Sequence, residues 1–384
     1  MLNNNLSISN KTLVGLNGLR FIAACLVING HSKLQSAFFA NYNSNPIWNF
    51  LFCNASQAVT FFFVLSGFLI TYLLLNEYEK NKQINIASFY KKRLLRIFPL
   101  YYLILICSTI IIPLAFFILH KKFTSYQTPQ VILYFLFLPN IVGMIGKLSH
   151  FWSIGVEEQF YLLWAPLVKY CRKYLPYIIL LIICLKWLQE FLFPLSTPAI
   201  TAIWWHAALI NFIKTFHIHY MAMGALGGYF LVYKPSYIYS KLWFSYVSQI
   251  IIFILLIIRF AFSTPYFMAQ FSALQFFQNS TFDAILLPIL FLLIIINVSL
   301  NKNSLLKTSG KLFDYLGDLS FGMYMFHLPL IYFLKPLFAK IYTTQTIDGY
   351  YIFYTLIIYM LTILLAAISF KYFESWFKKL RPKN

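Results

Sequence analysis

The chain has 384 residues, of which 60% are hydrophobic, 20% aromatic and 10% charged. Soluble domains carry about 25% charged residues, so this composition nearly excludes a soluble enzyme and also argues against a disordered or fibrous chain. The formal net charge of +20 does not indicate nucleic-acid binding, because the basic residues cluster at the ends of apolar runs. The composition predicts an all-α polytopic membrane protein.

Ten apolar segments reach the length that a membrane-spanning helix needs, which is about 17–25 residues. They cover residues 13–31, 56–76, 97–119, 151–168, 174–194, 212–232, 242–262, 281–300, 314–334 and 351–370. The run 131–146 is also apolar, but it is short and contains Pro139, Asn140 and two glycines. We interpret this run as interfacial or re-entrant.

The distribution of basic residues supports ten spans. With the N-terminus in the cytoplasm, 20 of the 30 Lys and Arg residues lie inside, six outside and four within spans. This asymmetry follows the positive-inside rule and places both termini in the cytoplasm. No linker or repeat divides the sequence, so we predict one membrane domain over residues 1–384, with a cytoplasmic N-terminal segment 1–12 and a basic cytoplasmic tail 371–384. The five cysteines form no CxxC pair, and we expect neither a disulfide framework nor a metal site.

The first segment carries two polar side chains, Arg20 and His31. Eleven residues of helix turn through about 1100°, so both side chains share one face, about 16 Å apart along the axis. In the predicted topology Arg20 lies toward the cytoplasm and His31 at the outer end. Polar groups inside a bilayer are costly and often functional, so the stripe indicates a polar path. The alternative is that His31 only caps its helix at the interface.

A basic cluster precedes and enters the third segment. Lys92 and Arg96 are four residues apart on one helix face, with Arg93 beside them. Guanidinium groups bind phosphates well, although such a cluster can also be an ordinary topological anchor.

The fourth segment follows His150 and contains Ser153 and two adjacent carboxylates, Glu157 and Glu158. Adjacent helical residues point about 100° apart, so the two carboxylates need not share a role. A buried carboxylate can orient an imidazole or act as a base. It can also form a purely structural pair with a lysine.

In the ninth segment Ser320, Tyr324 and His327 follow the spacing of one helical stripe. This stripe either lines the same cavity or holds a structural histidine.

Five motifs in this order resemble the acyltransferase-3 family of integral membrane acyltransferases, over nearly the whole chain. They are residues 18–20 with His31, and the stretches 62–71, 92–101, 152–161 and 320–327. Lys92 replaces an arginine that usually begins the basic loop, and Glu374-Ser375-Trp376 stands where the family often has Glu-Arg-Pro. The chain resembles the stand-alone type, which lacks an appended esterase-like domain.

The resemblance implies transfer of an acyl group, commonly acetyl, from cytoplasmic acyl-CoA to a carbohydrate hydroxyl. The acceptor would be a surface polysaccharide, a lipopolysaccharide or a lipid-linked oligosaccharide, and the enzyme would lie in a bacterial cytoplasmic membrane. Acyl-CoA is a substrate here, and no permanently bound cofactor is expected. His31 would be the general base or acyl carrier, Arg20 would position the donor, and Glu157 would orient His31 or complete the polar cavity. The basic loop would bind coenzyme A phosphates through Lys92, Arg93 and Arg96. The expected cavity lining is Ser153, His150, Glu158, Ser320, Tyr324 and His327.

A transporter or flippase for glycan precursors is the alternative, since such proteins also combine many spans with intramembrane charges. The Arg20 and His31 stripe, with Glu157 on another span, favours chemistry, because transport alone requires no base at the outer face. Direct transfer and an acyl-histidine intermediate are both compatible with the sequence.

Overall fold

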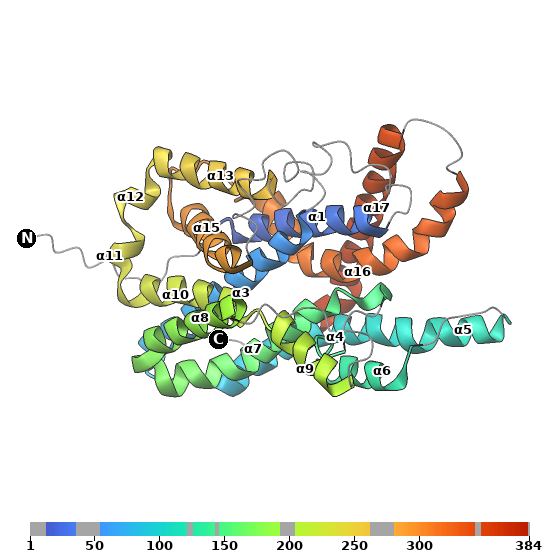
Figure 1. The fold of residues 1–384 in the computed structure, drawn as a ribbon, viewed down its shortest axis with the longest axis horizontal. Coiled ribbons are helices and arrows are strands. Elements are labelled where there is room, and N and C mark those ends of the chain that lie inside the picture. Colours follow the sequence, from blue (N-terminus) through green and yellow to red (C-terminus); the bar gives the residue numbers. More distant parts are fainter. Residues whose placement is uncertain are drawn as a thin grey trace, which may run out of the picture.

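The computed structural model describes residues 13–35, 54–120, 126–142, 146–192, 204–261, 280–341 and 347–382. These residues form helices and no strand, which confirms the all-α class. The predicted N-terminal segment 1–12 lies outside the described residues. Figure 1 shows the helices, which are α1 (Leu16–Gln35), α3 (Ala55–Asn81), α4 (Ile86–Ile106), α5 (Ile112–Ile118), α6 (Thr128–Phe135), α7 (Phe151–Cys171), α8 (Leu175–Leu192), α9 (Trp204–Thr215), α10 (Ile218–Tyr233), α11 (Pro235–Ile238), α12 (Lys241–Phe244), α13 (Tyr246–Ala261), α15 (Ser280–Leu300), α16 (Lys311–Ile341), α17 (Ile347–Ser369) and α18 (Ser375–Lys379).

Several of these helices can cross a membrane. By length and composition, four stretches of the described residues qualify, namely Ala55–Asn81, Ile86–Ile118, Phe151–Leu192 and Ile352–Lys379. The pair Pro235–Phe244 and Tyr246–Ala261, bent by 84°, makes a fifth if it counts as one span. The chain is therefore a multi-pass membrane protein, whereas the ten-span count and the cytoplasmic placement of both termini stay predictions.

One predicted boundary needs correction. The spans predicted at 151–168 and 174–194 correspond to α7 and α8, which follow each other without a loop through a 3₁₀ turn at Arg172–Tyr174. Pro176 lies in the first turn of α8, where a proline gives up only an N–H that has no intrahelical partner. The predicted span 212–232 is instead divided between α9 and α10, with Phe216 and His217 at the break.

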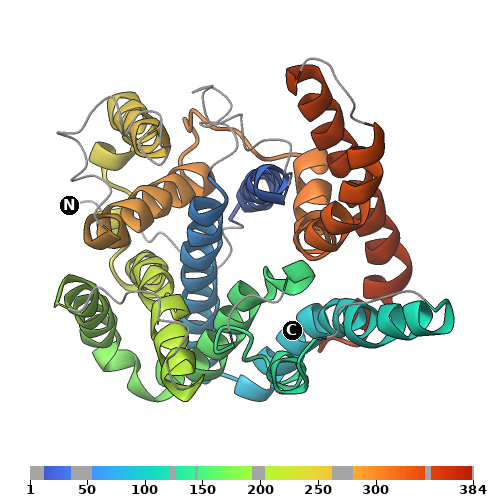
Figure 2. The same cartoon turned by 45° about the vertical axis from the view of Figure 1, so that its right-hand side comes forward.

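Helix α3 lies at the centre of the molecule, with α1 beside it (Figure 2). In the most apolar part of α3, 78% of the residues are buried, against 33% or less in the other three candidate spans. A helix that is apolar all round is expected to be buried on all sides. Ser66, Phe62 and Phe63 on α3 are thereby placed in the interior, where they contribute to the cavity described below.

Glycines set the close crossing of α3 and α10. A Cβ atom added to Gly67 would lie 1.8 Å from the Met221 carbonyl oxygen, and one added to Gly224 would lie 1.9 Å from that of Val64. Only hydrogen fits at these two positions, so the backbones touch directly. Small residues at helix contacts are the usual means of close packing between membrane helices.

The apolar run 131–146 does not cross the membrane as a helix. Helix α6 has eight residues, about 12 Å of helix, and the chain then turns at Phe137, whose φ is 58°. Asn140, 1% exposed, exchanges hydrogen bonds with the Gln159 side chain at 2.8 and 3.3 Å. The described part of the run is therefore folded back against α7.

Candidate active site

A cavity opens between α1, α3, α4, α7 and α16. It holds about 750 Å³ of empty space, its open mouth included. Three phenylalanines, Phe62, Phe63 and Phe321, form part of its wall. The polar residues on the wall are Arg20, Ser66, Arg93, Arg96, Ser153, Glu157, Tyr161, Ser320 and Tyr324.

Three guanidinium groups face this cavity, one from α1 and two from consecutive turns of α4. Arg20 donates a hydrogen bond to Asn17 Oδ1 at 2.8 Å, and the Arg93 guanidinium lies 5.1 Å from the centre of the Tyr161 ring. None of the three, Arg96 included, forms an ion pair within 4.0 Å among the described residues. Their charge is therefore available to an anionic ligand, for which arginine forks are well suited.

Glu157 is held by two neutral donors. Ser66 Oγ donates to its Oε1 at 3.0 Å, and the Tyr161 hydroxyl donates to its Oε2 at 3.2 Å. Glu157 was expected either to orient His31 or to complete the polar cavity, and this geometry supports the second role. Among the described residues, the ring in contact with His31 belongs to His327 and not to a neighbour of Glu157.

Three histidine rings gather next to the cavity-wall residue Tyr324. His327 lies 5.0 Å from His31 and 5.1 Å from His150, measured between ring centres. His150 and His327 are each 5.5 Å from the Tyr324 ring and are 1% and 0% exposed, whereas His31 is partly exposed. His327 of α16 thus lies next to His31 of α1, and His150 at the start of α7 lies next to His327.

The hydrogen bonds of this group fix where the protons lie. A carbonyl oxygen only accepts, so a ring nitrogen that faces one carries the proton. His327 Nδ1 faces the Tyr324 carbonyl at 2.5 Å, which leaves His327 Nε2 as an acceptor. His31 Nδ1 faces both the Val27 carbonyl at 3.0 Å and His327 Nε2 at 3.2 Å. Neutral His31 therefore carries its proton on Nδ1 and its lone pair on Nε2.

A short polar link joins the cavity wall to the histidines. Ser153 Oγ and the Tyr324 hydroxyl lie 2.5 Å apart, and both reach the His150 carbonyl, at 3.1 and 3.0 Å. His150 Nε2 in turn faces the Met325 carbonyl at 3.2 Å. The hydroxyls on the cavity wall thus end on the backbone of His150, whose ring lies 5.1 Å from that of His327.

The sequence-predicted residues fall into three groups. On the cavity wall lie Arg20, Arg93, Arg96, Glu157, Ser153, Ser320 and Tyr324. His150 and His327 lie directly next to the wall residue Tyr324, and His31 lies behind them, next to His327. Lys92 and Glu158 belong to neither group, and Glu158 Oε1 is buried without a hydrogen-bond partner among the described residues.

Sequence reasoning missed two residues of the site, Ser66 and Tyr161, which hold Glu157. Both fall inside the motifs 62–71 and 152–161. The signal was a hydroxyl inside an otherwise apolar segment, but nothing in the sequence shows that these hydroxyls meet one carboxylate.

The sequence of the chain matches a family model described as an acyltransferase domain, over residues 13–376. The chain belongs to the acyltransferase-3 family. This membership confirms the resemblance drawn from the five motifs.

Within the acyltransferase-3 family, the chain is similar to two bacterial proteins. It is 26% identical to "O-acetyltransferase OatA" of Staphylococcus aureus, in a match that covers 97% of this chain and 58% of that protein. It is 28% identical to "Peptidoglycan O-acetyltransferase OatA" of Listeria monocytogenes, over 43% of this chain and 26% of that protein. The match thus spans little more than half the length of the first relative and about a quarter of the second. No solved structure matches it significantly.

Proposed function

We propose that this protein transfers an acetyl group from cytoplasmic acetyl-CoA to a hydroxyl of a cell-wall glycan, in the cytoplasmic membrane of a bacterium. The observation that carries the proposal is the cavity itself, with three arginines that form no ion pair among the described residues and with Ser153 and Tyr324 beside a group of histidines. The names of the two relatives support acetyl transfer, and one of them names peptidoglycan. Neither is a transporter name, so the comparisons lend no support to the flippase alternative.

The arginine side of the cavity suits the donor. Arg20, Arg93 and Arg96 present three positive charges, against the single carboxylate of Glu157 on the same wall. Coenzyme A carries phosphates, and charge-assisted bonds from arginine to phosphate are among the strongest hydrogen bonds in proteins. Lys92 does not line the cavity and would contribute to donor binding only from a distance.

His31 suits the acceptor. Its Nε2 lone pair takes the proton of the acceptor hydroxyl while the hydroxyl oxygen attacks the thioester carbonyl. The carbon–sulfur bond breaks, and the coenzyme A thiolate leaves with the proton from the imidazolium. The products are an acetyl ester and coenzyme A. In a two-step route the same nitrogen attacks first and carries the acetyl group before the hydroxyl accepts it.

The topology that goes with this function has ten spans, with both termini in the cytoplasm. The 20-to-6 asymmetry of basic residues supports it. This arrangement puts the basic loop, with Arg93 and Arg96, on the side where acetyl-CoA is made. It puts His31 on the side where the glycan lies, so that the acetyl group crosses the membrane through the protein.

Acetyl transfer can be measured with the purified chain in detergent. We expect it to move labelled acetyl from acetyl-CoA onto peptidoglycan fragments as an alkali-labile ester, because the cavity supplies donor charges and a base. Fragments incubated without the protein are the control. Label that stays entirely in acetyl-CoA, with peptidoglycan and lipid-linked acceptors alike, would contradict the proposed function.

A further inference from the structure

A second group of polar side chains lies away from the cavity, where α8 meets the beginning of α10. Glu190 belongs to α8, His217 is the N-cap residue of α10, and His219 lies in the first turn of α10. One ligand-type atom from each of the three side chains lies within 4.8 Å of the other two. The fold therefore gathers two imidazoles and a carboxylate that the mechanism above does not use.

Three of the four ring nitrogens of these histidines are buried without a hydrogen bond among the described residues. His217 Nδ1 and both ring nitrogens of His219 are buried and have no hydrogen-bond partner among the described residues. His219 is only 2% exposed. Buried polar atoms in native proteins nearly always have a partner. The two ring nitrogens of His219 therefore lack an interaction that a buried imidazole is expected to make. A metal ion would supply it, because neutral imidazole is a common metal ligand.

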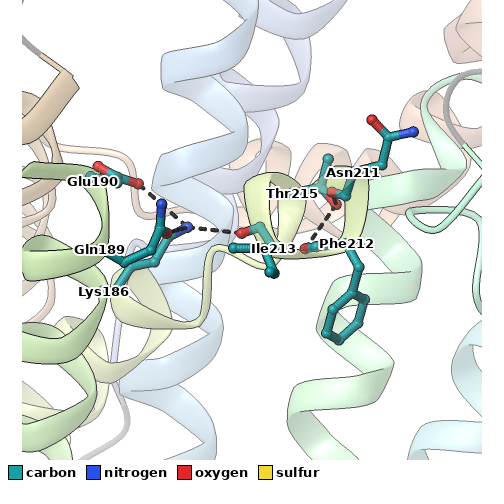
Figure 3. A network of polar contacts seen from close by, with 7 residues as sticks. All are labelled: Lys186, Gln189, Glu190, Asn211, Phe212, Ile213 and Thr215. Atoms are coloured by element: carbon teal, nitrogen blue, oxygen red, sulfur yellow. Dashed lines mark hydrogen bonds and ion pairs between the residues drawn. The ribbon is translucent and has the colours of Figure 1, made fainter. Parts of the chain in front are cut away.

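Lys186 forms an ion pair with Glu190 one turn along α8 (Figure 3). Its Nζ lies 3.6 Å from Glu190 Oε1 and donates to Gln189 Oε1 at 2.7 Å and to the Ile213 carbonyl at 2.8 Å. The ammonium is thus engaged with neutral oxygens, and its distance from the carboxylate exceeds a hydrogen bond. Ligating carboxylates are commonly oriented by such outer partners.

Aromatic rings enclose the two histidines. The Tyr220 ring lies 5.2 Å from that of His217 and 4.0 Å from that of His219. Phe63 and Trp152 lie 6.2 and 5.8 Å from the His217 ring. This surrounding restricts access of water, and Phe63 also lines the cavity, so the group is one side chain away from the proposed active site.

We propose that Glu190, His217 and His219 bind a Zn²⁺ ion. Zinc accepts histidine nitrogen and carboxylate oxygen at about 2.0–2.2 Å, whereas Ca²⁺ and Mg²⁺ prefer oxygen ligands throughout. Ligand atoms around a tetrahedral ion with these bond lengths lie about 3.3 Å apart, so side-chain rotation has to bring them together by no more than about 1.5 Å. The fourth position is left to water or a hydroxyl.

The ion ties α8 to the beginning of α10 beside the wall formed by Phe63 and Trp152. Because the helix breaks between α9 and α10 at Phe216 and His217, the beginning of α10 is not held by continuous helical hydrogen bonding. The zinc site stands independently of the proposed acetyl transfer, since it uses none of the residues assigned to that reaction.

Zinc titration of the purified full chain tests the proposal. Protein stripped with a chelator is titrated with ZnCl₂ against a chromogenic zinc indicator, and one Zn²⁺ per chain is expected. Losing an outer partner of a metal ligand weakens metal binding roughly 10- to 100-fold. His219→Asn and Glu190→Gln each remove a ligand itself, so the affinity for Zn²⁺ should fall by at least this factor. His120→Asn is the matched control, because His120 is an exposed histidine near the end of α5 with a φ of 52°, which asparagine tolerates.

Thermal unfolding gives a second readout. Zn²⁺ should raise the midpoint of the wild-type chain and of His120→Asn, but not that of His219→Asn. Less than a tenth of an equivalent of bound Zn²⁺ would overturn the proposal. Binding of wild-type strength in His219→Asn would also overturn it, because the ion would then lie elsewhere, for example at the His31 group. If His219→Asn does not fold, Glu190→Gln decides, since it keeps the size of the side chain, and unchanged affinity in that variant rejects the site.

Discussion

Replacing His31 by alanine should reduce acetyl transfer by at least about two decades, because general-base catalysis typically contributes 10²–10⁴-fold. Both hydrogen bonds that the described residues make to the His31 ring involve Nδ1, which leaves Nε2 as the basic nitrogen, and alanine has no group to replace it. His31→Gln should not restore the rate, since an amide does not take up the hydroxyl proton. The rate is measured with labelled acetyl-CoA and peptidoglycan fragments.

The exposed histidine His120 provides the control for this substitution. His120→Asn should keep the wild-type rate, and all variants are first compared for their level in the membrane, because an intramembrane polar residue can be needed for folding. A His31→Ala protein that inserts normally and keeps nearly full transfer would end the assignment. His150 or Glu157 would then be the next candidate for the base.

Charge reversal on the α4 face of the cavity should weaken donor binding. Arg93→Glu or Arg96→Glu removes a charged hydrogen bond worth roughly 1.5–3 kcal/mol, which corresponds to a rise in the KM for acetyl-CoA of about 10- to 150-fold. The KM for the glycan should change much less, since the acceptor is bound at the His31 side. Steady-state kinetics with each substrate varied in turn separates the two effects.

Lys91→Glu is the matched control for the arginine variants. Lys91 lies on the same helix, is exposed and does not line the cavity, so the same change of charge should leave the KM for acetyl-CoA near the wild-type value. If Arg93→Glu and Arg96→Glu behave like Lys91→Glu, the basic loop is only a topological anchor.

The sequence predicted the class of the fold and several of the residues that line the cavity, for identifiable reasons. Composition alone indicated membrane helices, and helical spacing placed Arg20 and His31 on one face of α1. The adjacent carboxylates Glu157 and Glu158 were expected to point in different directions, and only Glu157 lies on the cavity wall. Which of the two faces the cavity could not be read from spacing, because periodicity describes a helix and not its neighbours.

What the sequence could not provide are the contacts between distant segments. The partner of His31 is His327, 296 positions away, and a partner of Glu157 is Ser66, 91 positions away. The glycine crossing of α3 and α10 positions Ser66, but a glycine in an apolar segment does not reveal which helix it meets. The break at Phe216 and His217, inside the predicted span 212–232, was also missed.

The central claim is that the acetyl group passes from a donor on one side of the membrane to an acceptor on the other. Proteoliposomes containing the purified chain, with labelled acetyl-CoA sealed inside and peptidoglycan fragments only outside, test it most directly. In the vesicles whose basic loop faces the interior, we predict label on the external glycan, and His31→Ala should abolish it. External glycan that stays unlabelled, while the same vesicles transfer label once detergent mixes the two sides, would contradict the account.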